Sequence, residues 1–382
     1  MFRTLSCAAL LALSSPLLAS TTLAPDDQKT ATQLVGLLGH PSYKVREEAS
    51  AKLVQYGRAV EPVLRQGLNS TDAETRARCK RLLPLALQYS VEKQIAAFLA
   101  NRDEHDGSTL AGWAKFQQLA GCDDTARQLF ADMHRMDPLF LEEMDREPAG
   151  ARQKFATRCL EFMQMRNGGF GTAPPEQVAL LLFAALQPQV AQNTAGVSYL
   201  SGGLNSLSYQ AAGKELLRGH SILRKMLVQF LMHTDSSSAY TNLYLISNLE
   251  LKEGVDIARN IIRLPNRDLH AKVMAISLLG KIGGKECVAD IEPFLKDSTT
   301  FGAVRFGNGP QISTQVRDVA LATLVQLTGQ SMGDYHFPHV KMFPSQANFQ
   351  VHLSPGMLGF TDDAGRTAAL KKWADWRATE KK

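Results

Sequence analysis

Three histidines near the C-terminal end of the chain are the side chains best suited to bind a transition metal: His336, His339 and His352. Asp334 lies beside them in the sequence. Zinc and copper sites need three or four such ligands to converge. The spacing of the first two histidines places them on one side only in a helix, and Pro338 argues against a helix there. We therefore expect surface or packing histidines, and neither a metal nor another cofactor.

Two glycine-rich segments and one acidic cluster are the other chemical candidates. Asn167–Gly171 looks like a phosphate-binding loop but lacks the Gly-Lys-Ser/Thr ending and a preceding strand, and Gly307–Pro310 fails in the same way. Glu142, Glu143 and Asp145 are close carboxylates, which a solvated helix face explains. Neither G-x-S-x-G nor H-E-x-x-H occurs. The sequence therefore predicts no catalytic residues, and we do not expect an enzyme.

The first residues have the pattern of an export signal. Arg3 supplies a positive charge, and Leu5–Ala19 form an apolar segment that is too short to span a bilayer comfortably. Small residues follow, so we expect cleavage and an extracytoplasmic location, either periplasmic or secreted. An uncleaved anchor is the alternative, and only in that case do we expect contact with a membrane.

Cysteine usage and charge exclude several classes of protein. Cys79, Cys122, Cys159 and Cys287 follow the signal, without a C-x-x-C motif, so we expect free and mostly buried thiols. The net charge is +5, and the basic runs are interleaved with apolar or acidic residues. A nucleic-acid surface usually has a basic stripe with stacking aromatic residues. We therefore expect no nucleic-acid partner.

The elements that would position any site repeat along the chain. Four segments place a short side-chain oxygen four residues before a cation, a small residue three after that cation and a leucine seven after it. The oxygen and cation pairs are Ser42 with Arg46, Asp72 with Arg76, Asp268 with Lys272, and Ser313 with Arg317. The small residues are Ala49, Cys79, Ala275 and Ala320, and the leucines are Leu53, Leu83, Leu279 and Leu324.

This spacing has a physical explanation in paired helices. Serine or aspartate caps a helix by accepting from its first amides. The cation one turn later reaches that residue or a neighbouring repeat. Alternatively, the four cations together present a row of positive charges to an acidic partner. The small residue lets another helix approach, and the leucine lies on the same side and fills the core. Gly57 and Gly283 suit helix ends, and a short amphipathic helix precedes each template.

The other parts of the chain show weaker patterns. Residues 91–250 are helical without a clear repeat, and Gln187–Gln210, rich in Gly, Ser and Asn, is predicted to be a mobile loop. Thr299–Ile312 is predicted to be a Gly-rich loop. Asp362–Thr379 is predicted to be a final helix that closes the open end of a stack.

At this point the chain resembles HEAT-repeat proteins, through the template residues at 28–88 and 252–329. It also resembles the exported HEAT-repeat proteins of Planctomycetes, whose tails combine three features found here. These are Leu327–Gln330, Tyr335–Phe337 and the Lys-Trp-x-x-Trp helix at Lys372–Trp376. The resemblance implies an armadillo-like helical fold and an exported origin, and it implies no catalytic residues.

The expected fold is therefore all-α: an α-solenoid of HEAT-like helical hairpins with an irregular helical middle and a C-terminal capping helix. We expect a signal peptide at 1–22, N-terminal repeats at 28–90, an irregular region at 91–250, C-terminal repeats at 251–330, and an extended tail with the capping helix at 331–382.

The expected function is that of an exported scaffold or adaptor presenting an extended helical-repeat surface to a protein or peptide. Two alternatives stay open. One is an enzyme accessory or lyase-like HEAT protein with a pocket in the middle region, and the other is a membrane-anchored structural component of the cell envelope.

Overall fold

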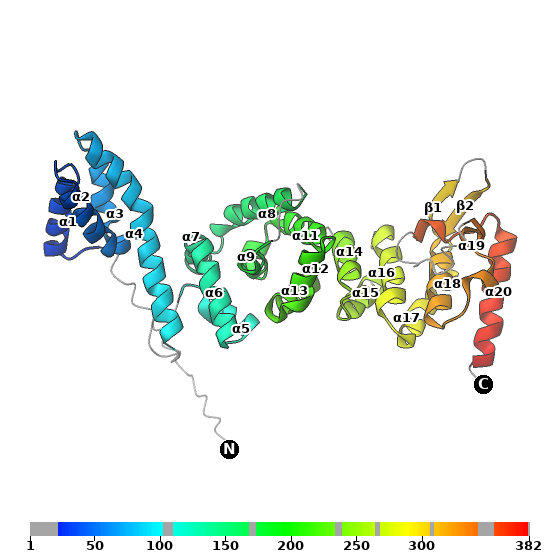
Figure 1. Ribbon diagram of the computed structural model, residues 1–382. Helices are drawn as coiled ribbons and strands as arrows, with labels where there is room; N and C mark the ends of the chain where they lie inside the picture. Colours follow the sequence, from blue (N-terminus) through cyan, green and yellow to red (C-terminus); the bar gives the residue numbers. More distant parts are fainter. Residues whose placement is uncertain are drawn as a thin grey trace, which may run out of the picture. The chain divides into compact units, whose positions relative to one another are not determined.

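In its described residues the chain is mostly helical, with one two-stranded sheet (Figure 1). The structure, a computed structural model, describes residues 22–101, 110–167, 173–233, 239–263, 268–305, 309–342 and 355–380. The predicted export signal lies outside these residues except for Thr22. In the described residues, no helix combines the length and the apolar character needed to cross a membrane.

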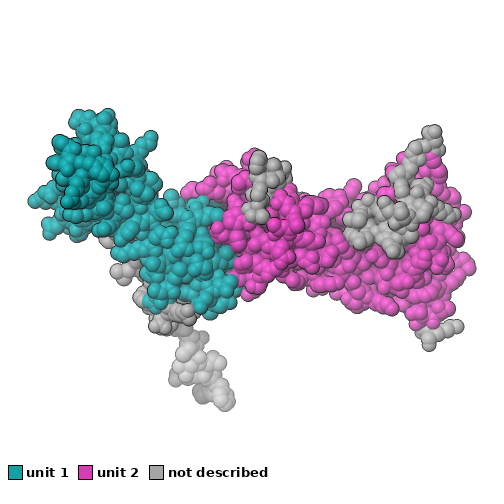
Figure 2. Space-filling view, viewed as in Figure 1, with its two compact units in different colours: residues 1–145 teal, residues 146–382 magenta. Residues whose placement is uncertain are grey.

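Two compact units divide the chain, residues 1–145 (unit 1) and 146–382 (unit 2) (Figure 2). The domain boundaries expected at 90/91 and 250/251 both fall inside a unit. The first falls inside a single long helix, because the helix that begins at Ala73 continues through Pro84 to Ala100. A proline removes one backbone hydrogen bond from a helix, and here it does not end the helix.

Unit 1 consists of seven α-helices and one short 3₁₀ turn in its described residues. They are α1 (Pro25–Leu37), α2 (Tyr43–Gln55), η1 (Gly57–Val60), α3 (Glu61–Gly67), α4 (Ala73–Ala100), α5 (Trp113–Ala120), α6 (Asp124–Met136) and α7 (Pro138–Arg146).

The first core of unit 1 lies between α1, α2, α3 and the first half of α4. It includes Ala49, Leu53 and Cys79 at template positions, all nearly inaccessible to solvent, while Leu83 is half-buried against the same core. A Cβ atom at Gly67 would lie 2.5 Å from the Cys79 sulfur. Small residues at these two positions therefore let α3 and α4 pack closely.

The second core of unit 1 is aromatic. Phe98 of α4 packs on Trp113 with ring centroids 5.0 Å apart, and Phe116 packs on Phe130 at 4.8 Å. The Arg127 guanidinium lies 4.0 Å from the centre of the Phe98 ring and donates to the carbonyl oxygen of that residue. Helices α5 and α6 pack on each other on either side of Gly121, which has φ +95°.

Unit 2 contains the remaining elements. The helices are α8 (Ala151–Asn167), α9 (Pro175–Ala185), α10 (Pro188–Ala191), α11 (Thr194–Ser208), α12 (Ala211–Gly219), α13 (Ser221–His233), α14 (Ala239–Leu249), α15 (Gly254–Arg263), α16 (Leu269–Ile282), α17 (Val288–Ile291), α18 (Val316–Leu327), α19 (Pro338–Met342) and α20 (Asp363–Glu380). The short turns are η2 (Lys285–Cys287), η3 (Glu292–Lys296), η4 (Met332–Tyr335) and η7 (Pro355–Met357), and the strands are β1 (Thr300–Arg305) and β2 (Gln311–Gln315).

The mobile loop predicted at 187–210 is wrong, because most of that segment forms helix α11 against α8. Asn193 caps α11 by accepting from the amide of Gly196 at 3.0 Å. A Cβ atom at Gly203 would lie 2.5 Å from the Phe162 ring. Glycines that suggested a loop are therefore residues that allow this close helix packing.

Helices α14, α16 and α18 follow one another side by side, with α15 packed on α16 (Figure 1). The template residues Ala275, Leu279, Ala320 and Leu324 are buried in this layer. A Cβ atom at Gly280 would lie 2.8 Å from the Thr323 methyl group, so α16 and α18 approach closely there.

The Gly-rich loop predicted at Thr299–Ile312 is wrong in most of its length, because β1 and β2 form an antiparallel hairpin. The described residues are nevertheless mostly helical, which agrees with the expected all-α class, and the hairpin is a small addition to it. Thr300, Phe301, Val304 and Ile312 are β-branched or aromatic residues, which favour strands. These residues favour strand pairing. The prediction of a loop gave more weight to the glycines of the segment than to them.

The final helix α20 covers α18 at the C-terminal end of unit 2. Asp362 caps it by accepting from the amide of Gly365 at 2.7 Å. Trp373 is buried, and Trp376 packs on it with ring centroids 5.0 Å apart. The final helix predicted from the sequence is therefore present, within one residue of its expected bounds.

Candidate functional site

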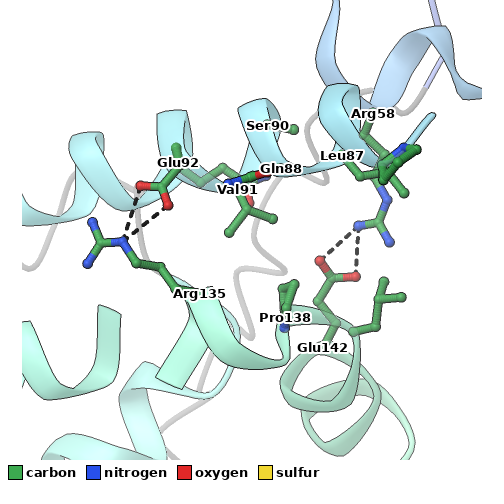
Figure 3. A pocket seen from close by; sticks show the side chains of 12 residues that line it. Arg58, Leu87, Gln88, Ser90, Val91, Glu92, Arg135, Pro138 and Glu142 are labelled. Carbon is green, nitrogen blue, oxygen red and sulfur yellow. Dashed lines mark hydrogen bonds and ion pairs between the residues drawn. The ribbon is translucent and has the colours of Figure 1, made fainter. Parts of the chain in front are cut away.

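The candidate site is a cavity of about 590 Å³ in unit 1, between the second half of α4, η1, and helices α6 and α7 (Figure 3). It is lined by Arg58, Pro84, Leu87, Gln88, Ser90, Val91, Glu92, Gln94, Arg135, Pro138, Leu139 and Glu142. This volume is in the usual range of small-molecule and peptide side-chain pockets.

Two ion pairs bridge the cavity at opposite ends, as Figure 3 shows. At one end, Nη1 of Arg58 donates to both carboxylate oxygens of Glu142 at 2.8 Å. At the other end, Nε of Arg135 lies 3.2 Å from both carboxylate oxygens of Glu92. Each end therefore holds one positive and one negative group, and the cavity carries no net charge from these four residues.

The side chains between the two ion pairs are apolar or neutral. Leu87 and Val91 of α4 point into the cavity opposite Pro138, and Leu139 of α7 is 51% exposed. Gln88 belongs to the same lining, as do Gln94 and Ser90. Amide and hydroxyl groups can both donate and accept hydrogen bonds, so this wall offers partners for a peptide backbone beside apolar contacts.

Local sequence explains the shape of the wall. Gly57 has φ +60°, and a Cβ atom there would lie 3.1 Å from that of Ser90, so η1 approaches α4 closely at this point. Gly57 and Gly283 both stand at helix ends as expected, but only Gly57 is left-handed, since Gly283 has φ −77°. Pro138 begins α7, a position where its missing N–H costs nothing.

The charged groups of the cavity are engaged with one another. Partial burial opposes the charge of Arg135, but the carboxylates of Asp132 and Glu92 outweigh it and raise its pKa. Glu142 is mostly buried against Arg58, so the expectation that it lies on a solvated helix face is wrong. Asp145 does lie on an exposed face, where it pairs with Lys115 at 3.1 Å.

The predicted capping residues differ in what they do. Asp72 accepts from the amide of Thr75 at 2.7 Å, and Asp268 accepts from the amide of Ala271 at 3.1 Å. Ser42 stands at the N-cap position of α2 but makes no capping bond with its side chain.

Ser313 is not a helix cap, and that prediction is wrong. It lies in β2, where it exchanges two backbone hydrogen bonds with Phe360 at 3.0 and 3.2 Å. Helix α18 begins three residues later, and Gln315 and Asp318 cap it reciprocally. The hairpin therefore moves the start of the helix away from the predicted cap.

The four predicted cations make intramolecular contacts. Arg46 donates to the carbonyls of His40 and Pro41 at 2.8 and 2.9 Å. Arg76 makes the equivalent bonds to Ser70 and Thr71 at 2.7 and 2.8 Å.

In unit 2, Lys272 lies 3.9 Å from Asp297, and Arg317 lies 3.9 Å from Asp363. Two cations belong to each unit, so neither unit gathers all four. Arg46 and Arg76 hold the turn before their own helix, which the sequence alone did not indicate.

The residues considered as metal ligands do not assemble in the described part of the chain, where no group of three His, Cys, Asp or Glu converges. His336 is exposed whereas His339 is buried. Pro338 begins α19, so the argument that it excludes a helix is wrong, since proline suits the first helical position. His352 and Gly168–Gly171 lie outside the described residues. The four cysteines after the signal are free, and Cys122 alone among them is exposed.

The sequence of unit 1 contained little signal for the cavity, because Arg58 and Glu142 are 84 positions apart. The comparisons with known proteins add no family: no family model, no curated protein and no solved structure matches the chain.

Proposed function

We propose that this chain is an exported scaffold of HEAT-like helical hairpins, and that the cavity of unit 1 holds an extended segment of a partner protein. The observation that carries the proposal is the lining of the cavity: an apolar centre with neutral amides, bridged at each end by an ion pair. Such a lining suits a peptide whose side chains are mainly apolar.

The repeat interpretation is supported by burial at equivalent positions. In three of the four templates, the small residue and the leucine are both buried against the preceding or following helix. Successive hairpins that stack in this way form an α-solenoid, which offers an extended binding surface. The arrangement of α14, α16 and α18 is the part of the chain that resembles such a stack most closely.

The peptide interpretation is supported by the balance of charge. Each end of the cavity pairs one arginine with one glutamate. The charges therefore cancel, and the cavity should not favour a strongly charged ligand. The amides of Gln88 and Gln94 can bind backbone groups of either polarity, while Leu87 and Val91 remove apolar side chains from water. The enzyme-accessory alternative predicted a pocket in residues 91–250, and seven of the twelve lining residues belong to that region. Among the described residues, no observation favours an anchored envelope component.

The proposal is tested with peptides selected from a random display library on the chain lacking residues 1–22. Affinities are then measured by calorimetry for the parent and for two variants. Val91→Asp places a charge in the cavity, and Leu85→Asp makes the same type of change on the exposed face of the same helix. We expect about a tenfold or larger loss of affinity for the first, corresponding to about 1.4 kcal/mol, and no significant change for the second.

Circular dichroism and thermal melting establish that both variants are folded. Selection of no cavity-dependent peptide, or an equal response of the two variants, would contradict the proposal.

A further inference from the structure

A continuous row of aromatic rings lies across neighbouring elements of unit 2. Tyr244 and Tyr240 of α14 have ring centroids 4.9 Å apart, and the Tyr240 ring lies 6.5 Å from that of His270 on α16. The His270 ring in turn lies 5.0 Å from that of Phe301 on β1. We refer to these four side chains as the aromatic row.

The aromatic row is open to solvent. Tyr240 is 41% exposed, the His270 side chain is 60% exposed, and Tyr244 and Phe301 are half-buried. Tyr209, which follows α11 and interacts electrostatically with Tyr244, is 66% exposed. Large aromatic rings on a surface leave apolar area in contact with water, which is unfavourable. Clusters of such rings are therefore typical of binding surfaces.

The rings are inclined to one another rather than coplanar. Tyr240 makes interplanar angles of 75° with Tyr244 and 81° with His270, and His270 makes an angle of 59° with Phe301. Steeply inclined neighbours present ring edges beside ring faces instead of one flat platform. Clefts between aromatic ridges receive the prolines of a polyproline II helix, whereas the flat face of a sugar ring needs an open aromatic plane.

The two tyrosines also bring hydroxyl groups to the aromatic row. The Tyr240 and Tyr244 oxygens are 3.0 Å apart. Burial and the Tyr240 hydroxyl raise the pKa of Tyr244 to about 12, so the Tyr244 hydroxyl keeps its proton at neutral pH. A polyproline II backbone makes no internal hydrogen bonds, and its carbonyls are therefore open to tyrosine donors.

An acidic side chain, Asp268, lies beside His270 of the aromatic row. The Asp268 side chain is 64% exposed, and its Oδ1 lies 3.9 Å from Nδ1 of His270. Its other oxygen caps α16. This exposed carboxylate complements a basic residue in a ligand, as opposite charges at an interface favour one another and fix the register of the bound chain.

We propose that the aromatic row binds a proline-rich segment of another protein in the polyproline II conformation, with an arginine or lysine of that segment beside Asp268. The successive ring distances limit the row to about 16 Å, the length of about five residues at about 3.1 Å each. The site belongs to unit 2 and does not depend on the cavity of unit 1.

The test uses the chain lacking residues 1–22 and a synthetic decapeptide that contains two Pro-x-x-Pro motifs followed by arginine. A peptide of the same composition with the prolines out of register serves as the ligand control, and a β-1,4-linked glucose hexamer tests a sugar. Tyr240→Ala is compared with Tyr43→Ala, which removes an even more exposed tyrosine of unit 1. Binding is followed by calorimetry and by tyrosine fluorescence.

We expect saturable binding of the decapeptide, weakened about tenfold or more by Tyr240→Ala, since aromatic residues dominate the energetics of such contacts, and unchanged by Tyr43→Ala. Asp268→Asn should weaken the arginine peptide several-fold and leave a glutamine version unchanged, because asparagine retains the cap. Three results would overturn the proposal. The control peptide with prolines out of register could bind as tightly as the decapeptide, the sugar could bind while the decapeptide does not, or Tyr240→Ala and Tyr43→Ala could weaken binding equally.

Discussion

Arg366 of α20 donates from Nε to Oδ1 of Asp318 in α18 at 2.8 Å, and both side chains are buried. The second carboxylate oxygen accepts from the amide of Gln315 at 2.8 Å, and Nη2 of Arg366 donates to the carbonyl of Ser313. One aspartate therefore caps α18 and also holds the C-terminal helix and the hairpin in place.

Breaking this pair should be strongly destabilising. Arg366→Met leaves the Asp318 carboxylate buried without its cation, a situation that typically costs about 3–5 kcal/mol. Asp318→Asn removes the buried carboxylate, but Arg366 keeps its ion pair with Asp363, so this variant should be destabilised by less. Because each single variant already removes the interaction, the double variant should cost clearly less than the two single variants together. Urea unfolding measures all three, and additive losses would show that the pair is not coupled.

Acid should destabilise unit 2 through a buried histidine. Burial lowers the pKa of His339 from 6.5 to about 4, so the unfolded chain binds a proton at a pH where the folded chain does not. The contribution of neutral His339 to the free energy of unfolding is complete above pH 6.5. It is lost as the pH falls from about 6.5 to about 4, by up to about 3 kcal/mol. His339→Phe should flatten the stability profile in this window. The exposed His336→Asn serves as the control and should leave the profile unchanged.

Two adjacent glycines of α11 should respond in opposite ways to alanine. A Cβ atom at Gly203 meets the Phe162 ring at 2.5 Å, whereas one at Gly202 meets only the flexible end of Met163 at 3.2 Å. Gly203→Ala should therefore cost about 1–3 kcal/mol by forcing α8 and α11 apart. Gly202→Ala should be neutral or slightly stabilising, because alanine favours the helix. Thermal unfolding distinguishes them, and equal midpoints would contradict the close packing.

The two N-terminal templates allow a direct test of capping. Asp72 makes a capping bond to Thr75, whereas Ser42 stands at the equivalent position of α2 without one. Asp72→Ala should lower the melting temperature by several degrees, since a lost cap leaves helix amides without a partner. Ser42→Ala should leave it almost unchanged, and a larger effect at Ser42 would show that the two positions do not differ as described.

The helical class was predictable because it depends on local spacing. Leu53, Leu279 and Leu324 are buried where the template placed them, since residues one or two turns apart lie on the same side of a helix. Gly196 and Gly203 misled the prediction, because composition alone does not distinguish a flexible segment from a helix that another helix approaches closely. Only the position of Phe155 and Phe162 on α8 resolves this.

The candidate sites depended on tertiary contacts and were therefore missed. The cavity joins Arg58 to Glu142, and the aromatic row joins side chains of α14, α16 and β1. No local pattern brings such residues together. The exposed aromatic residues of the row become informative only when the helices that carry them are known to be neighbours.

The shared carboxylate of Asp318 also constrains the order in which the chain folds. Synthesis proceeds from the N-terminus, so α18 is complete before Arg366 has been added to the growing polypeptide. Until then, burial of α18 would enclose an aspartate that lacks its positive counterpart, which is costly. The packing of α18 thus depends on a helix that is synthesised about fifty residues later, and a product terminated before α20 should be open to proteolysis at α18.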